Sequence, residues 1–357
     1  MKRTSVPAMR PNHVPNREDL SRVQGRLQED LARVRESLRS LVIPSQGRIS
    51  EPIRYAVEKP GRMLRPTLVL LSSYLLEDLP EGVRDTVAQQ RVIEAAAVVE
   101  TLHIATLCHD DLIDGATLRR GRPSTNAVYG DALALLAGDY LLARCMQVAA
   151  SLDVTRVQVM ADTLIDVCVG QMLESSQLHD AQRTEEDYLA AVSGKTARLL
   201  RTAAGMGALR SEASDDARAA LERFGHHLGM AFQIWDDILD ICSEETGKQQ
   251  AKDIMNGVYT LPVIYAVKDV PDLVLPLLRD LPISDEQCRR IVAVVRECGA
   301  IDRAAELAQR HISDALHAVE THPATMRRAP VVRQCLRDLI DVFATQHPAL
   351  HVLPTAP

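Results

Sequence analysis

The chain has 357 residues, a formal net charge of −7 and 46% hydrophobic residues, which is the composition of a soluble globular protein with a sizeable core. The acidic balance argues against a nucleic-acid partner. No uncharged apolar run approaches the ~18 residues that a transmembrane segment needs, and the N-terminus lacks the apolar region of a secretory signal. The seven cysteines form no C-x-x-C pair and fit a reducing compartment. We therefore expect a cytoplasmic protein.

The predicted elements are helical almost throughout. Residues 1–16 are expected to form a flexible N-terminal arm and residues 347–357 a flexible C-terminal tail, which leaves a folded domain over 17–346. Gly, Pro and clusters of Asp, Ser and Thr separate the helical segments, and no alternating strand with a hairpin turn is found. Apolar residues recur at three- and four-residue steps, in chain order, over 91–114, 131–151, 153–178, 184–208 and 214–241. The pattern predicts a single all-α domain.

Two acidic triads stand at the ends of apolar segments. The first is Asp110, Asp111 and Asp114 in HDDLIDG, and the second is Asp236, Asp237 and Asp240 in WDDILDI. On a helix, the first and last members of such a triad share a face, where carboxylates repel one another and oppose the helix dipole. Oxygen-rich sites of this kind suit Mg²⁺, which usually takes one or two carboxylates together with substrate phosphates.

Basic residues follow both triads in the sequence, and others lie further upstream of them. Arginine pairs can bind phosphate oxygens bidentately, whereas lysine supplies a point charge. Each basic group alone would be interpreted as solvated surface. Together with two triads they predict a magnesium cluster for one diphosphate and a separate arginine pocket for a second. The polar and basic set is Arg62, Arg65, Arg119, Arg120, Lys195, Thr196 and Lys248.

In combination, these motifs resemble the trans-isoprenyl diphosphate synthases, also called polyprenyl synthetases, and most closely the bacterial long-chain members. The resemblance runs from about Gly61 to Pro262. It is carried, in family order, by GRMLRP, HIATLCHDDLIDGATLRRGRPS, LAGDYLLAR, GQMLES, KTA, FQIWDDILD and GKQQAKDIMNGVYTLP. It implies an isoprenoid synthase-type helical bundle around a central active-site cavity, and a homodimer.

The implied activity is a prenyl transfer. The enzyme would join isopentenyl diphosphate to an allylic diphosphate (dimethylallyl, geranyl, farnesyl or geranylgeranyl), release diphosphate and repeat the step to build a long all-trans chain. Magnesium and cationic side chains would neutralise charge on the leaving diphosphate, and a dry cavity would protect the allylic cation.

The resemblance also implies roles for single residues. Asp110 and Asp114 would hold magnesium from one side with the help of Asp111, and Asp236 would hold it from the other, with about three ions in the closed complex. Asp237 and Asp240 would support the second side, most simply through water.

Two diphosphate pockets follow from the same resemblance. The allylic diphosphate would be bound by Arg119, Lys195, Thr196, Gln233 and Lys248. Isopentenyl diphosphate would be bound by Arg62, Arg65, His103 and Arg120.

The sequence departs from the family pattern at four positions. Arg62 stands where Lys is usual, Met63 replaces an Arg, and Ala251 replaces a Gly. Val258 stands where many members have a Lys near the diphosphates, which puts one electrostatic contact in doubt.

Three other interpretations fit part of this pattern. A geranylgeranyl diphosphate synthase would share every motif. A class I terpene cyclase would lack the second diphosphate pocket and the second D-D-x-x-D. A non-catalytic subunit of a heteromeric synthase would be expected to lose aspartates, and all six are present. The adjacent His226 and His227 could suggest a metal, but a pair on the helix surface or in the core explains them better.

Product length is expected to depend on residues that precede the first triad. Leu102, Ala105 and Thr106 lie one to two helical turns before Asp110, at ~5.4 Å per turn. Ala105 and Thr106 are small, which predicts room for a product longer than farnesyl.

Overall fold

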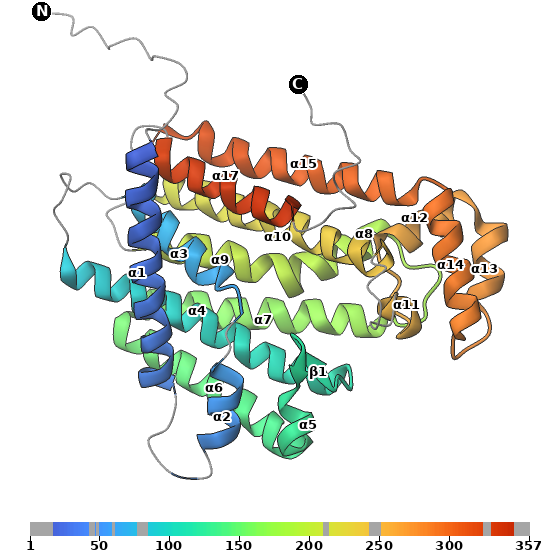
Figure 1. Cartoon of the computed structure of the whole chain (residues 1–357), viewed down its shortest axis with the longest axis horizontal. Helices are drawn as coiled ribbons and strands as arrows, with labels where there is room; N and C mark the ends of the chain where they lie inside the picture. Colours follow the sequence, from blue (N-terminus) through green and yellow to red (C-terminus); the bar gives the residue numbers. More distant parts are fainter. Residues whose placement is uncertain are drawn as a thin grey trace, which may run out of the picture.

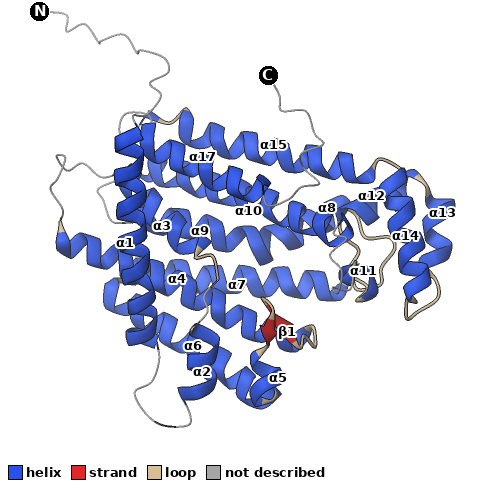
Figure 2. Cartoon of the chain, in the orientation of Figure 1, coloured by secondary structure: helices blue, strands red, loops and turns tan. Residues whose placement is uncertain are grey.

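In the computed structural model, the described residues are 17–42, 47, 50–58, 61–76, 85–209, 214–242, 251–323 and 330–345. The predicted arm at 1–16, the predicted tail at 347–357 and Lys248 lie outside them. Figure 1 shows long helices running side by side along the molecule, with α1 (Arg17–Val42) crossing them near one end. Figure 2 shows that nearly all of the described chain is helix, which confirms the all-α prediction.

The helices follow one another in the order of the sequence. The first half contains α2 (Ser50–Val57), α3 (Leu64–Leu75), α4 (Thr86–Ile113), α5 (Thr125–Tyr129), α6 (Asp131–Leu152) and α7 (Val154–Ser176). The second half contains α8 (Glu185–Val192), a π-helical turn η1 (Ser193–Ala197), α9 (Arg198–Ala208), α10 (Asp215–Cys242), α11 (Lys252–Met255), α12 (Leu261–Asp269), α13 (Pro271–Leu278), α14 (Asp285–Glu297), α15 (Ala300–Glu320) and α17 (Pro330–Thr345).

Helix α4 is the central element of the bundle. It is apolar nearly all round, as a helix must be when other helices cover every face. Both α4 and α6 are long and apolar enough to cross a membrane by length and composition, but about 78% of the apolar window of α4 is buried inside the protein, against 39% for α6. The apolarity of α4 is therefore explained by its place in the core.

Helix ends fall at polar residues that the sequence marks. The carboxylate of Asp85 accepts hydrogen bonds from the first turn of α4, and Thr184 forms a reciprocal capping box with Asp187 at the start of α8. Helix α4 ends at Asp114, followed by Gly115 with a φ of 58°. The first triad therefore closes α4, as predicted, and Asp240 lies in the last turn of α10.

A small β-hairpin follows α4, where the sequence predicted none. Strands β1 (Leu118–Arg119) and β2 (Arg122–Pro123) pair in antiparallel register. The two turn residues, Arg120 and Gly121, have φ values of 53° and 73°. A two-residue turn with both φ positive matches the twist of a hairpin, but Arg is an unusual residue for it, so the hairpin has no clear sequence signal.

Candidate active site

A cavity of about 550 Å³ lies where the ends of α4 and α10 meet α7, α8, η1 and α11. Its wall is strongly charged. The carboxylates of Asp114, Glu174, Asp236, Asp237 and Asp253 line it, together with the cations Arg119, Arg183, Lys195 and Lys252. The two triads, which are more than 100 residues apart in the sequence, thus contribute to one cavity.

The members of the first triad differ in their environment. Asp111 is buried, and Arg119 donates hydrogen bonds to its Oδ1 atom from Nε at 2.8 Å and Nη2 at 2.5 Å. Burial raises the pKa of Asp110 to about 6, and Asp114 raises it further, whereas Lys195 and Arg119 oppose the shift. A bound cation would favour the ionised form of such a carboxyl group, so the raised pKa fits a cation-binding role.

The second triad is also divided. Asp237 is buried and accepts hydrogen bonds from the hydroxyl of Tyr188 at 2.6 Å and from Nε2 of Gln233 at 2.8 Å. Asp240 accepts bonds from the backbone N–H groups of Lys252 and Asp253, both at 3.2 Å, and so fixes the start of α11. Loss of solvent around the carboxyl group, together with the charge of Asp240, raises the pKa of Asp236. The Asp236 side chain still lines the cavity.

Lys195 is positioned by a close crossing of α7 and η1. A Cβ added at Gly170 would lie 2.3 Å from the backbone nitrogen of Lys195, so only glycine permits this approach. One turn further along α7, Oε1 of Glu174 accepts a hydrogen bond of 2.5 Å from Nζ of Lys195. Burial alone would lower the pKa of Lys195, but Glu174 and Asp110 outweigh burial and raise it, so the side chain is a stable cation.

Thr196 and Gln233 belong to one hydrogen-bonded chain. The hydroxyl of Thr196 donates to Oε1 of Gln233 at 2.9 Å, and Gln233 in turn donates to Asp237. The chain continues to Tyr188, which is buried. Gln233 reaches the cavity wall, whereas Thr196 supports it from behind.

The residues predicted for the second diphosphate also converge. Arg120 lies against Gly61, where an added Cβ would lie 2.2 Å from its guanidinium. Burial lowers the pKa of Arg65 to about 10 against the opposing effect of Glu100, and it lowers the pKa of buried His103 well below its usual range. His103 is therefore a neutral imidazole beside two cations. Arg62 is exposed and close enough to Asp236 to lower its pKa.

Glu100 and Glu174 are polar site residues that the sequence analysis missed, and Asp253, which lies in the last motif of the resemblance, was given no role. Glu100 is 1% exposed, and burial raises its pKa to about 7 although Arg65 and Arg120 oppose the shift. A signal for it exists, because Glu100 is the only acidic or basic residue other than histidine between Glu94 and Asp110. Burial and Asp240 raise the pKa of Asp253 to about 7.

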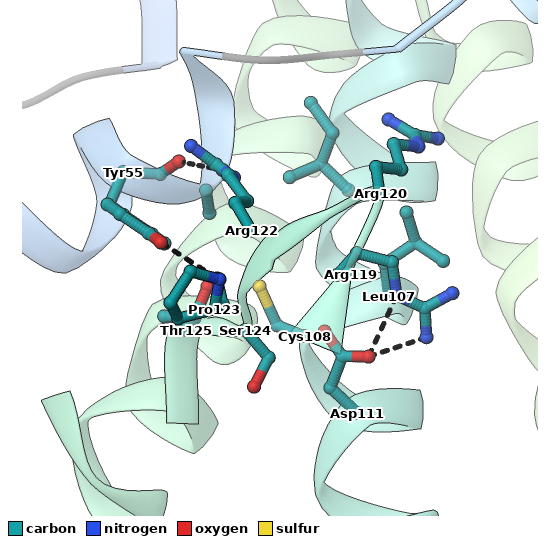
Figure 3. Close-up of a pocket in the computed structure, with 12 residues that line it drawn as sticks. Tyr55, Leu107, Cys108, Asp111, Arg119, Arg120, Arg122, Pro123, Ser124 and Thr125 are labelled. Atoms are coloured by element: carbon teal, nitrogen blue, oxygen red, sulfur yellow. Dashed lines mark hydrogen bonds and ion pairs between the residues drawn. The ribbon is translucent and has the colours of Figure 1, made fainter. Parts of the chain in front are cut away.

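The hairpin that carries Arg119 and Arg120 is held from the other side by α2. Figure 3 shows Arg119 directed at Asp111, while Arg122 and Pro123 face Tyr55. The hydroxyl of Tyr55 donates to the carbonyl of Pro123 at 2.7 Å, and Nη2 of Arg122 donates to the carbonyl of Tyr55 at 2.5 Å. The guanidinium of Arg122 also lies over the Tyr55 ring, 4.1 Å from its centroid. These contacts fix where the two preceding arginines sit.

The residues predicted to set product length lie in the core. Leu102 and Ala105 are fully buried and Thr106 is 9% exposed. None of the three lines the cavity within the described part of the chain. Ala105 shares a face of α4 with Val98, whose carbonyl accepts a hydrogen bond of 3.5 Å from Sγ of Cys145 on α6. The face that bears Ala105 is therefore the one turned toward α6.

Comparisons with known proteins identify the family of the chain. The family profile described as polyprenyl synthetase matches residues 46–295. The chain is 33% identical to heptaprenyl diphosphate synthase component 2 of Geobacillus stearothermophilus, over 88% of this chain and 94% of that protein. It is 34% identical to nonaprenyl diphosphate synthase of Mycobacterium tuberculosis, over 89% of this chain and 92% of that protein. The crystal structure of a Caulobacter crescentus polyprenyl synthase complexed with calcium and isoprenyl diphosphate superposes with a TM-score of 0.79 at 26% identity, covering 93% of this chain and 98% of that one.

Proposed function

Because the chain belongs to the polyprenyl synthetase family and is a prenyltransferase, we propose that it condenses isopentenyl diphosphate with an allylic diphosphate and elongates the product to a long-chain all-trans polyprenyl diphosphate. The observation that carries the proposal is the cavity wall, in which two aspartate motifs meet Lys195 and Arg119. A second cationic group is formed by Arg65 and Arg120, which both interact electrostatically with Glu100.

The donor set fits magnesium, on which this family generally depends. The acidic residues that line the cavity are aspartates and a glutamate, and no cysteine or histidine is among the described lining residues. Hard cations such as magnesium prefer these oxygen ligands. Asp110, Asp114 and Asp236 are the ligands we propose, with about three ions in the closed complex. Bound magnesium supplies positive charge to the leaving diphosphate. Asp111, Asp237 and Asp240 already bind Arg119, Tyr188 and α11, which fits a supporting role.

The cationic side chains divide into two sets. Lys195 and Arg119 line the acidic wall and take the allylic diphosphate, with Gln233 and Thr196 orienting the pocket. The sequence adds Lys248 to this set, although it lies outside the described residues. Arg62, Arg65, His103 and Arg120 take isopentenyl diphosphate. His103 is neutral and therefore donates a hydrogen bond without adding charge.

The chain's residues support ionisation followed by alkylation. Lys195 and Arg119 stabilise the diphosphate as the allylic carbon–oxygen bond breaks. Ala, Leu and Val side chains exclude water from the resulting cation. The double bond of isopentenyl diphosphate then attacks the cation, and the proton lost from the new product passes to the departing diphosphate.

The long-chain product rests on two supports. The relatives with the matches described above are named for heptaprenyl and nonaprenyl products. Ala105 and Thr106 place no aromatic ring on the face of α4 below the metal motif. A geranylgeranyl product is the alternative, and the preferred primer is one of the dimethylallyl, geranyl, farnesyl or geranylgeranyl diphosphates.

We further propose a cytoplasmic homodimer. Large apolar side chains are exposed on α6 and α7, among them Leu133, Leu136, Ile165, Val169 and Met172, at 45–61% of their surface. Monomeric proteins rarely leave such a patch uncovered. One relative is named as component 2 of its synthase. The alternative is therefore that a different subunit covers this face of α6 and α7.

One experiment tests the activity and the assembly together. The purified chain alone is incubated with Mg²⁺, isopentenyl diphosphate and each allylic primer, and the products are separated by chromatography while the particle mass is measured by sedimentation. We expect a dimer that makes a product longer than farnesyl. A monomer without activity would refute the homodimer, and a cyclised hydrocarbon would refute the transferase.

A further inference from the structure

A cluster of metal-binding side chains lies between α10 and α15. It contains His227 from α10, with His311 and Asp314 from α15, and their ligand atoms all lie within 4.8 Å of one another. Nδ1 of His227 is 3.0 Å from Nδ1 of His311, and the two ring centroids are 5.3 Å apart. Among the described residues, it is the only group of three such side chains this compact.

The spacing of the two imidazoles fits two ligands of one metal ion. Two nitrogen ligands on a tetrahedral zinc ion, each ~2.0–2.1 Å from the metal, lie roughly 3.3 Å apart, close to the observed 3.0 Å. His311 and Asp314 are three residues apart on α15 and therefore share one face. Because α10 and α15 pack along their length (Figure 1), His227 meets that face from the neighbouring helix.

The imidazoles are in the form that binds metals. Burial lowers the pKa of both His227 and His311, and His227 lowers that of His311 further, although the carboxylate of Asp314 opposes the shift at both. Neutral imidazole is the ligating form. A hydrogen bond from one neutral ring to the other would account for the 3.0 Å contact alone, and the proposal adds the carboxylate of Asp314 as a third ligand.

We propose that His227, His311 and Asp314 bind a divalent transition ion of the zinc class, with water at the fourth position. Two nitrogens and one oxygen favour zinc, cobalt or nickel, in contrast to the all-oxygen set that suits magnesium in the cavity. His227 precedes Asp236 by nine residues, which is ~13 Å along the helix, so the site is distinct from the cavity. The ion would pin α15 to the helix that carries the second triad and stabilise the fold.

The test uses the full chain, stripped with EDTA and then held in millimolar Mg²⁺ to occupy the cavity carboxylates. Titration with Co²⁺ should give the intense visible absorption of a four-coordinate ion, saturating at a single equivalent and displaced by Zn²⁺. Saturating Zn²⁺ should raise the melting temperature by a few degrees. His227→Asn and His311→Asn should each weaken Co²⁺ binding at least tenfold and abolish the thermal shift. His317→Asn, which alters an exposed histidine on the same helix, should change neither.

A different set of results would overturn the proposal. It fails if wild-type protein shows no such absorption, or if both histidine variants bind Co²⁺ as tightly as the wild type. If either histidine variant loses its helical circular dichroism, Asp314→Ala replaces it, because Asp314 is exposed and its removal should not affect folding. That variant must also bind Co²⁺ at least tenfold more weakly, and unchanged binding would refute the site.

Discussion

Arg119 grips Asp111 with two hydrogen bonds to one carboxylate oxygen, at 2.8 and 2.5 Å. The contact joins Asp111, a member of the first aspartate triad, to Arg119, which we assign to the allylic diphosphate pocket. Asp111 is therefore paired with a protein cation, whereas Asp114 lines the cavity. This supports the division in which Asp110 and Asp114 bind metal and Asp111 assists by holding Arg119 in place.

Metal dependence follows from the acidic wall. Asp110→Ala and Asp236→Ala should each remove most condensation activity, because each deletes a carboxylate that we assign to magnesium. Both variants should remain folded, since burial without a cation disfavours the charged form at these positions and removing it costs little. The rate of diphosphate release checks the first point and circular dichroism the second. Undiminished activity of the wild type in EDTA would contradict the assignment.

The two diphosphate pockets should separate in kinetics. Arg65→Ala should chiefly raise the apparent Michaelis constant for isopentenyl diphosphate, and Lys195→Ala should chiefly affect the allylic substrate. A charge-assisted contact contributes roughly 1.5–3 kcal/mol, so the change should be about tenfold or more. Initial rates with each substrate varied in turn measure both constants. If both variants perturbed one and the same substrate, the separate pockets would be wrong.

Glu100 should make the free energy of unfolding depend on pH. Its pKa rises from an ordinary 4.5 to about 7 in the fold, so between these values the folded state keeps a proton that the unfolded state has lost. Stability contributed by this group is present below pH ~4.5 and is lost as the pH rises through 7. Glu100→Gln cannot ionise and should gain about 3 kcal/mol over the wild type between pH 5 and pH 8.

Urea denaturation of both proteins at several pH values measures this difference. Asp110 and Asp253, whose pKa values are also raised, contribute equally to the two proteins, so the difference isolates Glu100. A difference that does not change with pH would mean that Glu100 is ionised throughout, held by Arg65 and Arg120.

The residue types of the site were largely predictable from sequence, whereas the contacts between their side chains were not. The triads and the arginine pairs are local motifs, and their placement at helix ends is confirmed for α4 and α10. The pairing of Glu174 with Lys195 depends on how closely Gly170 lets α7 approach η1, which no local pattern encodes. The family and the all-α fold are confirmed, and the roles of the single residues stay predictions.

The burial of individual charged residues was the second feature that the sequence did not predict. Glu100 and Asp237 become distinctive only because the bundle encloses them, and the helical pattern of α4 gives no preferred face by which to locate Glu100. The Arg120–Gly121 turn has positive φ at an arginine, and its hairpin is anchored by the hydrogen bond from the hydroxyl of Tyr55 to the carbonyl of Pro123. Such tertiary support overrides the local preference of the residue.

Product length should depend on the α6-facing side of α4. Ala105 is fully buried there, one to two turns before the first triad, so a ring at this position must displace whatever packs beside it. Ala105→Phe should shorten the product, because the ring either blocks the growing tail or forces the helices apart at a cost of ~1–3 kcal/mol. Ala88→Phe is a matched control, since Ala88 lies in the first turn of α4, far from the triad, and is half-buried. Chromatography of the products from the wild type and both variants measures chain length. The face of α4 would not set the length if the wild type stopped at farnesyl, or if Ala105→Phe left the product unchanged while remaining folded.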